Sequence, residues 1–194
     1  MHSFDLISEA IEHSKLTEYE NQTGIKKTEV SEYGLKKLYR AHLKNYPFSN
    51  IPVLLGTHLG VCPLSTVESL IFQKKGGYCF DHAQLFASVL KEKGFDFTFR
   101  MGRVGPDGPI THLVLLVSVD ADTFLVDPGF GSGPMVPLPL NGTIVEDLGF
   151  HYRILLNQET GNFTLERKDG DLWKSLYEIY NAPVKKLMYR WVTS

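Results

Sequence analysis

The chain has 194 residues, with 20 basic and 22 acidic side chains and a formal net charge of −2. It lacks the concentrated basic surface that binds phosphate backbones, so nucleic acid is excluded as a main partner. Nowhere do about 18 apolar residues run together, and the start has neither the basic nor the apolar region of a secretion signal. We therefore expect a cytoplasmic protein with no membrane partner.

Two cysteines, Cys62 and Cys79, are too few for a disulfide framework in a chain of this size. The sequence alone does not decide whether they form a single disulfide, although reduced thiols fit a cytoplasmic protein better. Neither cysteine belongs to a cluster with the spacing of metal ligands, so no metal site is expected.

The first half of the chain carries helical periodicity. Apolar residues recur every three and four positions in segments 4–16 and 30–46, which predicts two helices. The second helix would bury one face, formed by Leu35, Leu38, Tyr39 and His42.

Two more helices follow after a break at Pro47 and Pro52, which remove backbone donors. Ser65 and Glu68 have the spacing of a capping box and predict a helix over 65–74. The pair Gly76 and Gly77 ends it, and a further helix is predicted from Cys79 to Gly94.

The second half changes to β-rich runs separated by turn-like sequences. Six strands at short spacing predict an antiparallel sheet or small barrel. The predicted fold class is therefore α+β, with a helical domain over 1–93 and a β-barrel-like domain over 94–194. The predicted strands cover 95–104, 112–119, 123–130, 152–157, 162–167 and 176–181.

Cys79 is the first candidate for chemistry, because it opens a predicted helix directly after a flexible glycine pair. The N-terminus of a helix stabilises a thiolate, and the glycines leave room for a ligand to approach the sulfur. Taken alone, a cysteine at a helix start is more often an inert small hydrophobe.

His112 and Asp127 are the candidate partners of this cysteine. His112 opens the strand "HLVLLVSV", and Asp127 closes the strand that returns from the next turn. Hairpin pairing would make them cross-strand neighbours, as a base and the group that orients it. Taken singly, His112 could be an ordinary histidine at a strand end, and Asp127 could be a turn residue before Pro128. The three together favour a Cys–His–Asp core of the cysteine-peptidase kind. A peptidase or a transglutaminase would have the same triad, but the sequence lacks the local motifs of those enzymes.

Three separated motifs carry a resemblance to a known family. The run "GGYCF" followed by an acidic residue, the histidine opening "HLVLLV", and "VDPGFG" resemble the arylamine N-acetyltransferases in order and spacing, and "PFSNIPV" fits as well. The resemblance extends from about residue 4 to 180. It implies a helical first domain, a β-barrel second domain and an α/β third domain.

The resemblance also implies the reaction and its substrates. In this family a cysteine takes acetyl from acetyl-CoA, and an arylamine, arylhydrazine or N-hydroxyarylamine then removes it in a ping-pong reaction of xenobiotic metabolism. By the resemblance, Cys79 carries the thioester, His112 is the base and Asp127 orients His112.

Further residues near these motifs are candidates for binding. Phe130 matches a position that lines the acceptor pocket in the family, and Thr111 beside His112 is assigned to the same pocket. Backbone N–H groups of a glycine-rich loop could approach a phosphate of coenzyme A. The glycines of this loop are Gly129, Gly131 and Gly133.

The sequence departs from the family pattern in four respects. Lys75, Asp81 and Ala83 replace an arginine, a glutamate and an asparagine around the cysteine, and the chain stops where the third domain should begin. Such a chain could instead be an acyl-thioester hydrolase, an amide synthase, or a shortened non-catalytic paralogue that binds a ligand. An uncovered apolar cleft would favour a homo-oligomer.

Overall fold

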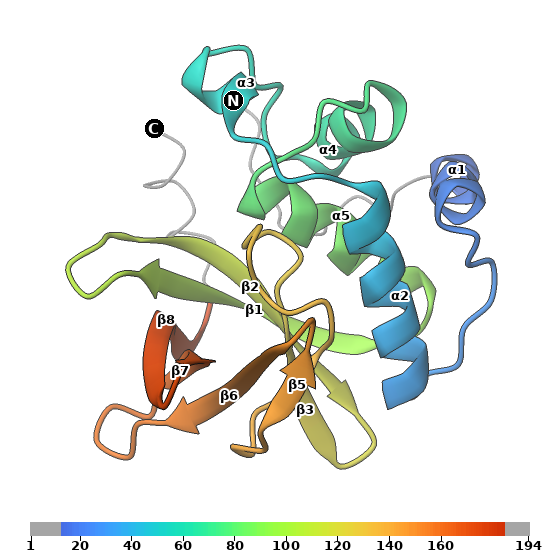
Figure 1. The fold of residues 1–194 in the computed structure, drawn as a ribbon. Helices are drawn as coiled ribbons and strands as arrows, with labels where there is room; N and C mark the ends of the chain where they lie inside the picture. Colours follow the sequence, from blue (N-terminus) through green and yellow to red (C-terminus); the bar gives the residue numbers. More distant parts are fainter. Residues whose placement is uncertain (1–12, 185–194) are drawn as a thin grey trace.

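The computed structural model describes residues 13–184, in which every helix precedes the first strand (Figure 1). The helices lie together on one side of the molecule, and the strands form the other side. The helical elements are α1 (His13–Thr23), α2 (Glu32–Asn45), α3 (Ile51–Leu54), α4 (Pro63–Val67), the π-helical η1 (Glu68–Phe72) and α5 (Cys79–Glu92).

The helix predicted over 30–46 is confirmed as α2. The Ser31 side chain caps it by accepting a hydrogen bond from Gly34 N, and the predicted face is buried. Of the helix predicted over 4–16, residues 4–12 lie outside the described part of the chain, and α1 begins at His13.

The capping box predicted at Ser65 is wrong. The helix begins two residues earlier, and Cys62 is its N-cap, with Sγ accepting a hydrogen bond from Ser65 N at 3.4 Å. Pro63 fits the first helical position because its missing N–H would be unpaired there in any case. At Glu68 the helix widens into η1, which ends at Phe72 rather than at Lys74.

The described strands form one antiparallel sheet in the order β4-β3-β2-β1-β8-β7-β6-β5. Each of the six predicted strands has a counterpart, but the strand predicted over 123–130 ends at Val126, just before Asp127 and Pro128. Strands β4 and β5 were missed, because two or three residues are too few to show an alternating pattern. The strands are β1 (Asp96–Val104), β2 (Ile110–Val119), β3 (Asp122–Val126), β4 (Leu138–Pro139), β5 (Val145–Asp147), β6 (Phe150–Leu156), β7 (Phe163–Asp169) and β8 (Leu172–Pro183).

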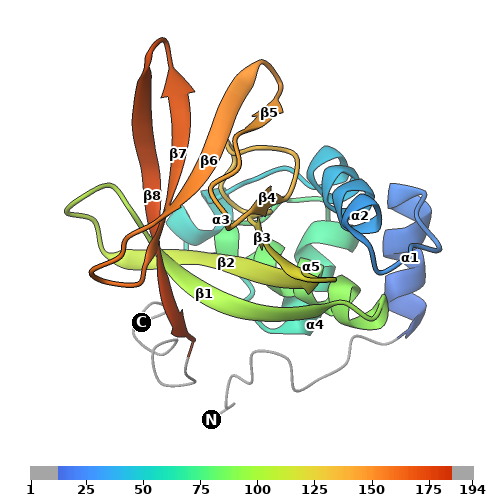
Figure 2. The same ribbon diagram turned by 90° about the horizontal axis from the view of Figure 1, so that it is seen from below.

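The sheet curls strongly, so that β4 at one edge approaches β6 near the other (Figure 2). Alternate residues of β2 therefore face two different cores. Leu113 and Leu115 pack with α2 and α5, whereas Val114 and Leu116 face the interior of the curled sheet with Tyr177. This α+β architecture is the predicted fold class, while the boundary between domains 1–93 and 94–194 stays a prediction. None of the helices within 13–184 has the length and apolar character to span a membrane.

A buried chain of hydrogen bonds joins α1, α2 and α5. Tyr19 OH lies 3.3 Å from His42 Nδ1, and His42 Nε2 lies 3.0 Å from His82 Nδ1. His82 Nε2 then lies 3.3 Å from the carbonyl oxygen of Pro47. Because that carbonyl only accepts, His82 carries its proton on Nε2, and both imidazoles are satisfied in the neutral form.

This chain makes the fold sensitive to acid. Burial lowers the pKa of His82 from 6.5 to about 4 and that of His42 well below the usual range. Below pH 6.5 the unfolded chain binds a proton at His82 and the folded chain does not, so the free energy of unfolding falls. Between pH 7 and pH 5 we expect His82 to contribute a loss of about 2 kcal/mol.

Denaturant titrations of the wild type and of His82→Asn at both pH values test this expectation. The difference between their pH dependences isolates His82, and it should equal the predicted loss. His151→Asn, at a half-exposed position, should keep the wild-type pH dependence. Equal pH dependence in the wild type and His82→Asn would contradict the assignment.

Candidate active site

Cys79 is the first residue of α5, and its side chain is partly exposed. The preceding residues are held against segment 47–49, since Phe48 pairs with Gly77 and Ser49 N donates to Gly77 O at 2.8 Å. The Cys79 Sγ lies 3.8 Å from the carbonyl oxygen of Thr111, at the start of β2. Cys62, the other free cysteine, is exposed at the start of α4.

His112 and Asp127 meet as the hairpin predicts. The β2–β3 ladder ends at the pair Leu115 and Val126, and Asp127 follows directly. His112 Nε2 lies 2.7 Å from Asp127 Oδ2, and both side chains are buried. The Nε2–H group donates a hydrogen bond to the carboxylate, which leaves Nδ1 of the ring for another partner.

The Cys79 side chain is among the groups that act on His112. Burial lowers the pKa of His112, but the charge and hydrogen bond of Asp127, together with the hydrogen bond and charge of Cys79, outweigh it and raise the pKa to about 10. At neutral pH the imidazole is therefore protonated on both nitrogens. The structure thus brings together the three residues that the sequence singled out, from α5, β2 and the end of β3.

Two tyrosines that sequence reasoning missed hold Asp127. Tyr177 in β8 donates its hydroxyl to Asp127 Oδ2 at 2.6 Å, and its ring lies edge-on to His112 with centroids 5.0 Å apart. Tyr39 in α2 donates to the Asp127 carbonyl at 2.8 Å. Tyr177 stands 50 positions from Asp127 in the chain, so no local pattern announces their contact.

Replacing Tyr177 by phenylalanine should destabilise the fold by about 1.5–3 kcal/mol, the usual range for a hydrogen bond to a charged group. The packing of the ring remains, so the loss of stability reports the contribution of the Tyr177 hydroxyl. Tyr33→Phe is a matched control because Tyr33 is exposed, and it should change stability little. Chemical denaturation compares the two, and an equal effect of both substitutions would contradict the assigned bond.

The glycine-rich loop after Asp127 lies directly against Cys79. A Cβ on Gly129 would stand 2.3 Å from Cys79 Cα, so only glycine fits there. Gly129 N donates to Asp127 Oδ1 at 3.2 Å, so its amide is already engaged. Gly131 is exposed and has a φ of +78°, while Gly133 is half-buried. Coenzyme A binding by these glycines stays a prediction.

The two candidate acceptor residues differ in their surroundings. The Phe130 ring packs against the rings of His112 and Tyr177, with centroids 5.5 and 4.9 Å away. Thr111 is exposed, and it approaches Cys79 through its backbone carbonyl rather than its hydroxyl. Both therefore lie beside the triad, and their role in binding stays a prediction.

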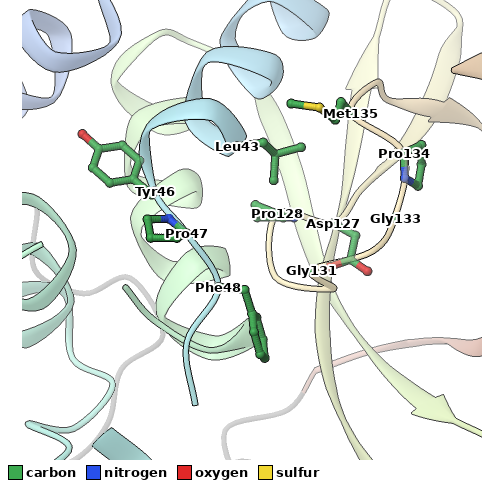
Figure 3. A pocket seen from close by; sticks show the side chains of 10 residues that line it. All are labelled: Leu43, Tyr46, Pro47, Phe48, Asp127, Pro128, Gly131, Gly133, Pro134 and Met135. Carbon is green, nitrogen blue, oxygen red and sulfur yellow. The ribbon is translucent and has the colours of Figure 1, made fainter. Parts of the chain in front are cut away.

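A cavity of about 250 Å³ lies between the end of α2 and the loop after Asp127 (Figure 3). Its lining combines apolar side chains with polar atoms in nearly equal measure, and Asp127 belongs to both the lining and the triad. Side chains from the two sides face each other across the space in Figure 3. The lining includes Leu43, Pro47, Phe48, Pro128, Gly131 and Met135.

The three substitutions around the cysteine have different structural outcomes. Lys75 is exposed, and Ala83 is fully buried in the helical core. Asp81 is buried and accepts a hydrogen bond from Tyr78 N at 3.1 Å, in the first turn of α5. Of the three, Asp81 alone supports the start of the helix that carries Cys79.

Fold and site together define an α+β protein with a Cys–His–Asp core of the cysteine-peptidase kind. The N-acetyltransferase family model matches residues 33–193. The chain is 32% identical over 149 residues to the arylamine N-acetyltransferase / N-hydroxyarylamine O-acetyltransferase of Salmonella typhimurium, covering 74% of this chain and 53% of that protein. It is also 29% identical over 161 residues to the proansamycin X synthase of Amycolatopsis mediterranei, covering 77% and 60%.

Solved structures agree with the sequence comparison. The arylamine N-acetyltransferase from Salmonella typhimurium superposes with a TM-score of 0.84 at 26% identity, covering 92% of this chain and 68% of that one. The Mycobacterium marinum enzyme in complex with CoA gives 0.82 at 28% identity, covering 92% and 69%. The chain belongs to the arylamine N-acetyltransferase family, and it spans about half the length of the Salmonella typhimurium and Escherichia coli relatives it matches.

Proposed function

We propose that this protein is an arylamine N-acetyltransferase that moves acetyl from acetyl-CoA to a small aromatic amine through a thioester on Cys79. The observation that carries the proposal is the convergence of three residues: Cys79 opens α5 with its Sγ 3.8 Å from the carbonyl oxygen of Thr111, and the next residue, His112, is held by Asp127 at 2.7 Å. The relatives named above support the same chemistry, and the Mycobacterium marinum structure with CoA supports the donor.

In the first half-reaction the Cys79 sulfur attacks the acetyl carbonyl carbon. His112, protonated at neutral pH, pairs with the attacking sulfur and gives a proton to the sulfur of coenzyme A as the C–S bond breaks. Donor and product are both thioesters, so this step is nearly balanced in energy. Backbone N–H groups in the first turn of α5 would stabilise the tetrahedral oxyanion.

In the second half-reaction the acceptor nitrogen attacks the acetyl carbon on Cys79. The nitrogen loses a proton to His112, the C–S bond breaks and the cysteine is regenerated. Asp127 keeps the same ring orientation through both steps, because Tyr177 and Gly129 N hold its carboxylate in place. An arylamine, arylhydrazine or N-hydroxyarylamine is weakly basic and remains nucleophilic at neutral pH.

The cavity beside the loop offers a place for the aromatic ring of the acceptor. Its volume of about 250 Å³ exceeds that of one aromatic ring, apolar side chains such as Leu43 and Phe48 line part of it, and it borders the triad at Asp127. Phe48 lines it and is 45% exposed. The backbone pairing of Phe48 with Gly77 places this residue close to the start of α5.

Truncating Phe48 to alanine should raise the KM for an arylamine about tenfold, because one aromatic contact is removed from the cavity. Acetylation of Cys79 by a small activated ester should stay within about twofold, since the triad is untouched. Phe72→Ala, at a 50% exposed position in η1, is the matched control. An unchanged KM in Phe48→Ala would show that the acceptor binds elsewhere.

The transfer itself is tested by incubating the chain with acetyl-CoA and an arylamine and measuring N-acetylarylamine and free coenzyme A. The wild type should release both in equal amounts, and Cys79→Ala should release neither. Free coenzyme A with acetate alone would favour the acyl-thioester hydrolase. One relative is named a synthase, so an amide synthase is the second candidate, tested by replacing acetyl-CoA with longer acyl thioesters. If no donor modifies Cys79, the result would favour the hypothesis of a non-catalytic paralogue.

A further inference from the structure

A second histidine–aspartate pair lies on the other side of the nucleophile. His58, in the loop between α3 and α4, places Nε2 3.1 and 3.0 Å from the two carboxylate oxygens of Asp81. Asp81 is 1% exposed, two residues after Cys79 in the first turn of α5. The pair thus ties a distant loop to the helix that presents the sulfur.

The position of Asp81 is fixed by the glycine before the cysteine. A Cβ on Gly77 would stand 2.6 Å from the Asp81 Cβ, so the carboxylate can fold back over the chain only because this residue is glycine. From there Asp81 Oδ2 accepts a hydrogen bond from Tyr78 N at 3.1 Å. Gly129 lies directly against the Cys79 backbone, so two glycines allow close packing at the first turn of α5.

The location of the proton on His58 follows from its other neighbour. Gly60 N lies 3.1 Å from His58 Nδ1 and donates to it, so the ring carries its proton on Nε2, directed at Asp81. The Tyr78 ring lies edge-on to His58 with centroids 5.1 Å apart and limits its rotation. A neutral histidine in this arrangement already supplies the donor that Asp81 needs.

The buried carboxylate depends on these partners for its charge. Burial raises the pKa of Asp81, while His58, the Tyr78 amide and Thr66 of α4 lower it. Of these partners, His58 is the titratable one. Without His58 the largest opposing influence is lost, so Asp81 would take up a proton at a higher pH.

We propose that His58 is a positioning residue for Cys79, holding Asp81 ionised so that its charge-assisted bond to Tyr78 N fixes the first turn of α5. The inference rests on the proposed function only in taking Cys79 as the nucleophile. A protonated Asp81 would make a weaker bond to the amide, and the sulfur would lose its fixed place beside His112.

The test measures the rate at which iodoacetamide alkylates Cys79 between pH 5.5 and 8.5, by peptide mass spectrometry, with Cys62 followed in the same digest. In His58→Phe the Cys79 rate should fall about tenfold at pH 6 and recover to within about twofold at pH 8.5. Asp81→Asn, which mimics the protonated carboxyl, should lower the rate at every pH. His58→Gln restores a donor and should recover most of the wild-type profile, and His151→Phe should match the wild type.

The outcomes separate the two claims. If Cys79 of the wild type reacts no faster than Cys62, the proposed nucleophile fails and this inference fails with it. If wild-type Cys79 is the faster thiol but His58→Phe keeps the wild-type profile, only the role of His58 is overturned. If the alkylation rates of Cys79 and Cys62 change in parallel at every pH, the substitution has disrupted the loop as a whole. This result would also overturn the positioning role of His58.

Discussion

Replacing Asp127 by asparagine should slow the acetylation of Cys79 by about 10³–10⁴-fold, as for other triads that lose the orienting carboxylate. The charge of Asp127 and its 2.7 Å bond to His112 Nε2 are the main influences that raise the pKa of that imidazole to about 10. Asparagine occupies the same space without the charge. His112 would then lose both the proton that pairs with the Cys79 sulfur and the bond that orients its ring.

The measurement is the burst of p-nitrophenol when the protein is mixed with p-nitrophenyl acetate, with thermal unfolding recorded on the same samples. Asp122→Asn is the control, because Asp122 is exposed at the other end of β3. It should keep the full burst rate. A burst in Asp127→Asn within tenfold of the wild type would mean that Asp127 does not orient the base.

Alanine at position 129 should disable the site by a different route. Its Cβ would lie 2.3 Å from Cys79 Cα, 2.9 Å from Cys79 Cβ and 3.1 Å from Cys79 O, contacts that only a shift of the backbone can relieve. We expect a loss of stability of about 3 kcal/mol, at the upper end for overpacking, and a fall of about 100-fold in Cys79 acetylation. Denaturation and the p-nitrophenol burst measure the two effects.

Gly133→Ala is the matched control within the same loop. Its Cβ would meet only the Phe130 ring at 3.4 Å, an ordinary contact, and we expect both stability and acetylation to change little. If Gly129→Ala behaves like Gly133→Ala, the loop does not press on the nucleophile as the structure indicates.

The triad was predictable because it depends on local signals. Cys79 stands at the start of a helix that a glycine pair announces, and His112 and Asp127 lie at matching ends of one hairpin. Strand alternation and a short turn bring the last two together without knowledge of the remaining fold. The strands of five or more residues were also recognisable, whereas β4 and β5 were too short to show a period.

The residues that support the triad were not predictable, because they reach it from distant elements. Tyr177 lies in an ordinary strand, and its contact with Asp127 exists only because the sheet curls β8 over β2. His58 sits in a loop with no pattern of its own. The N-cap of α4 was misassigned because serine is the usual capping residue, and here the Cys62 sulfur takes that role.

The buried histidines show the same limit. His42 was recognised as part of the apolar face of α2, and the structure confirms its burial. Its bond to His82 joins residues 40 positions apart, and periodicity does not show that two imidazoles meet in a core. Burial of a polar group requires a partner, but the partner is found only in the folded chain.

The central claim is that Cys79 is the residue acylated during transfer, and the two free cysteines of the chain allow a direct test. The protein is mixed with p-nitrophenyl acetate, stopped in acid after one burst, and digested for mass spectrometry. We predict an acetyl group on the Cys79 peptide, absent from the Cys62 peptide and removed when an arylamine is added before the acid. Acetyl on Cys62 to the same extent, or an unmodified Cys79 after release of p-nitrophenol, would contradict the account.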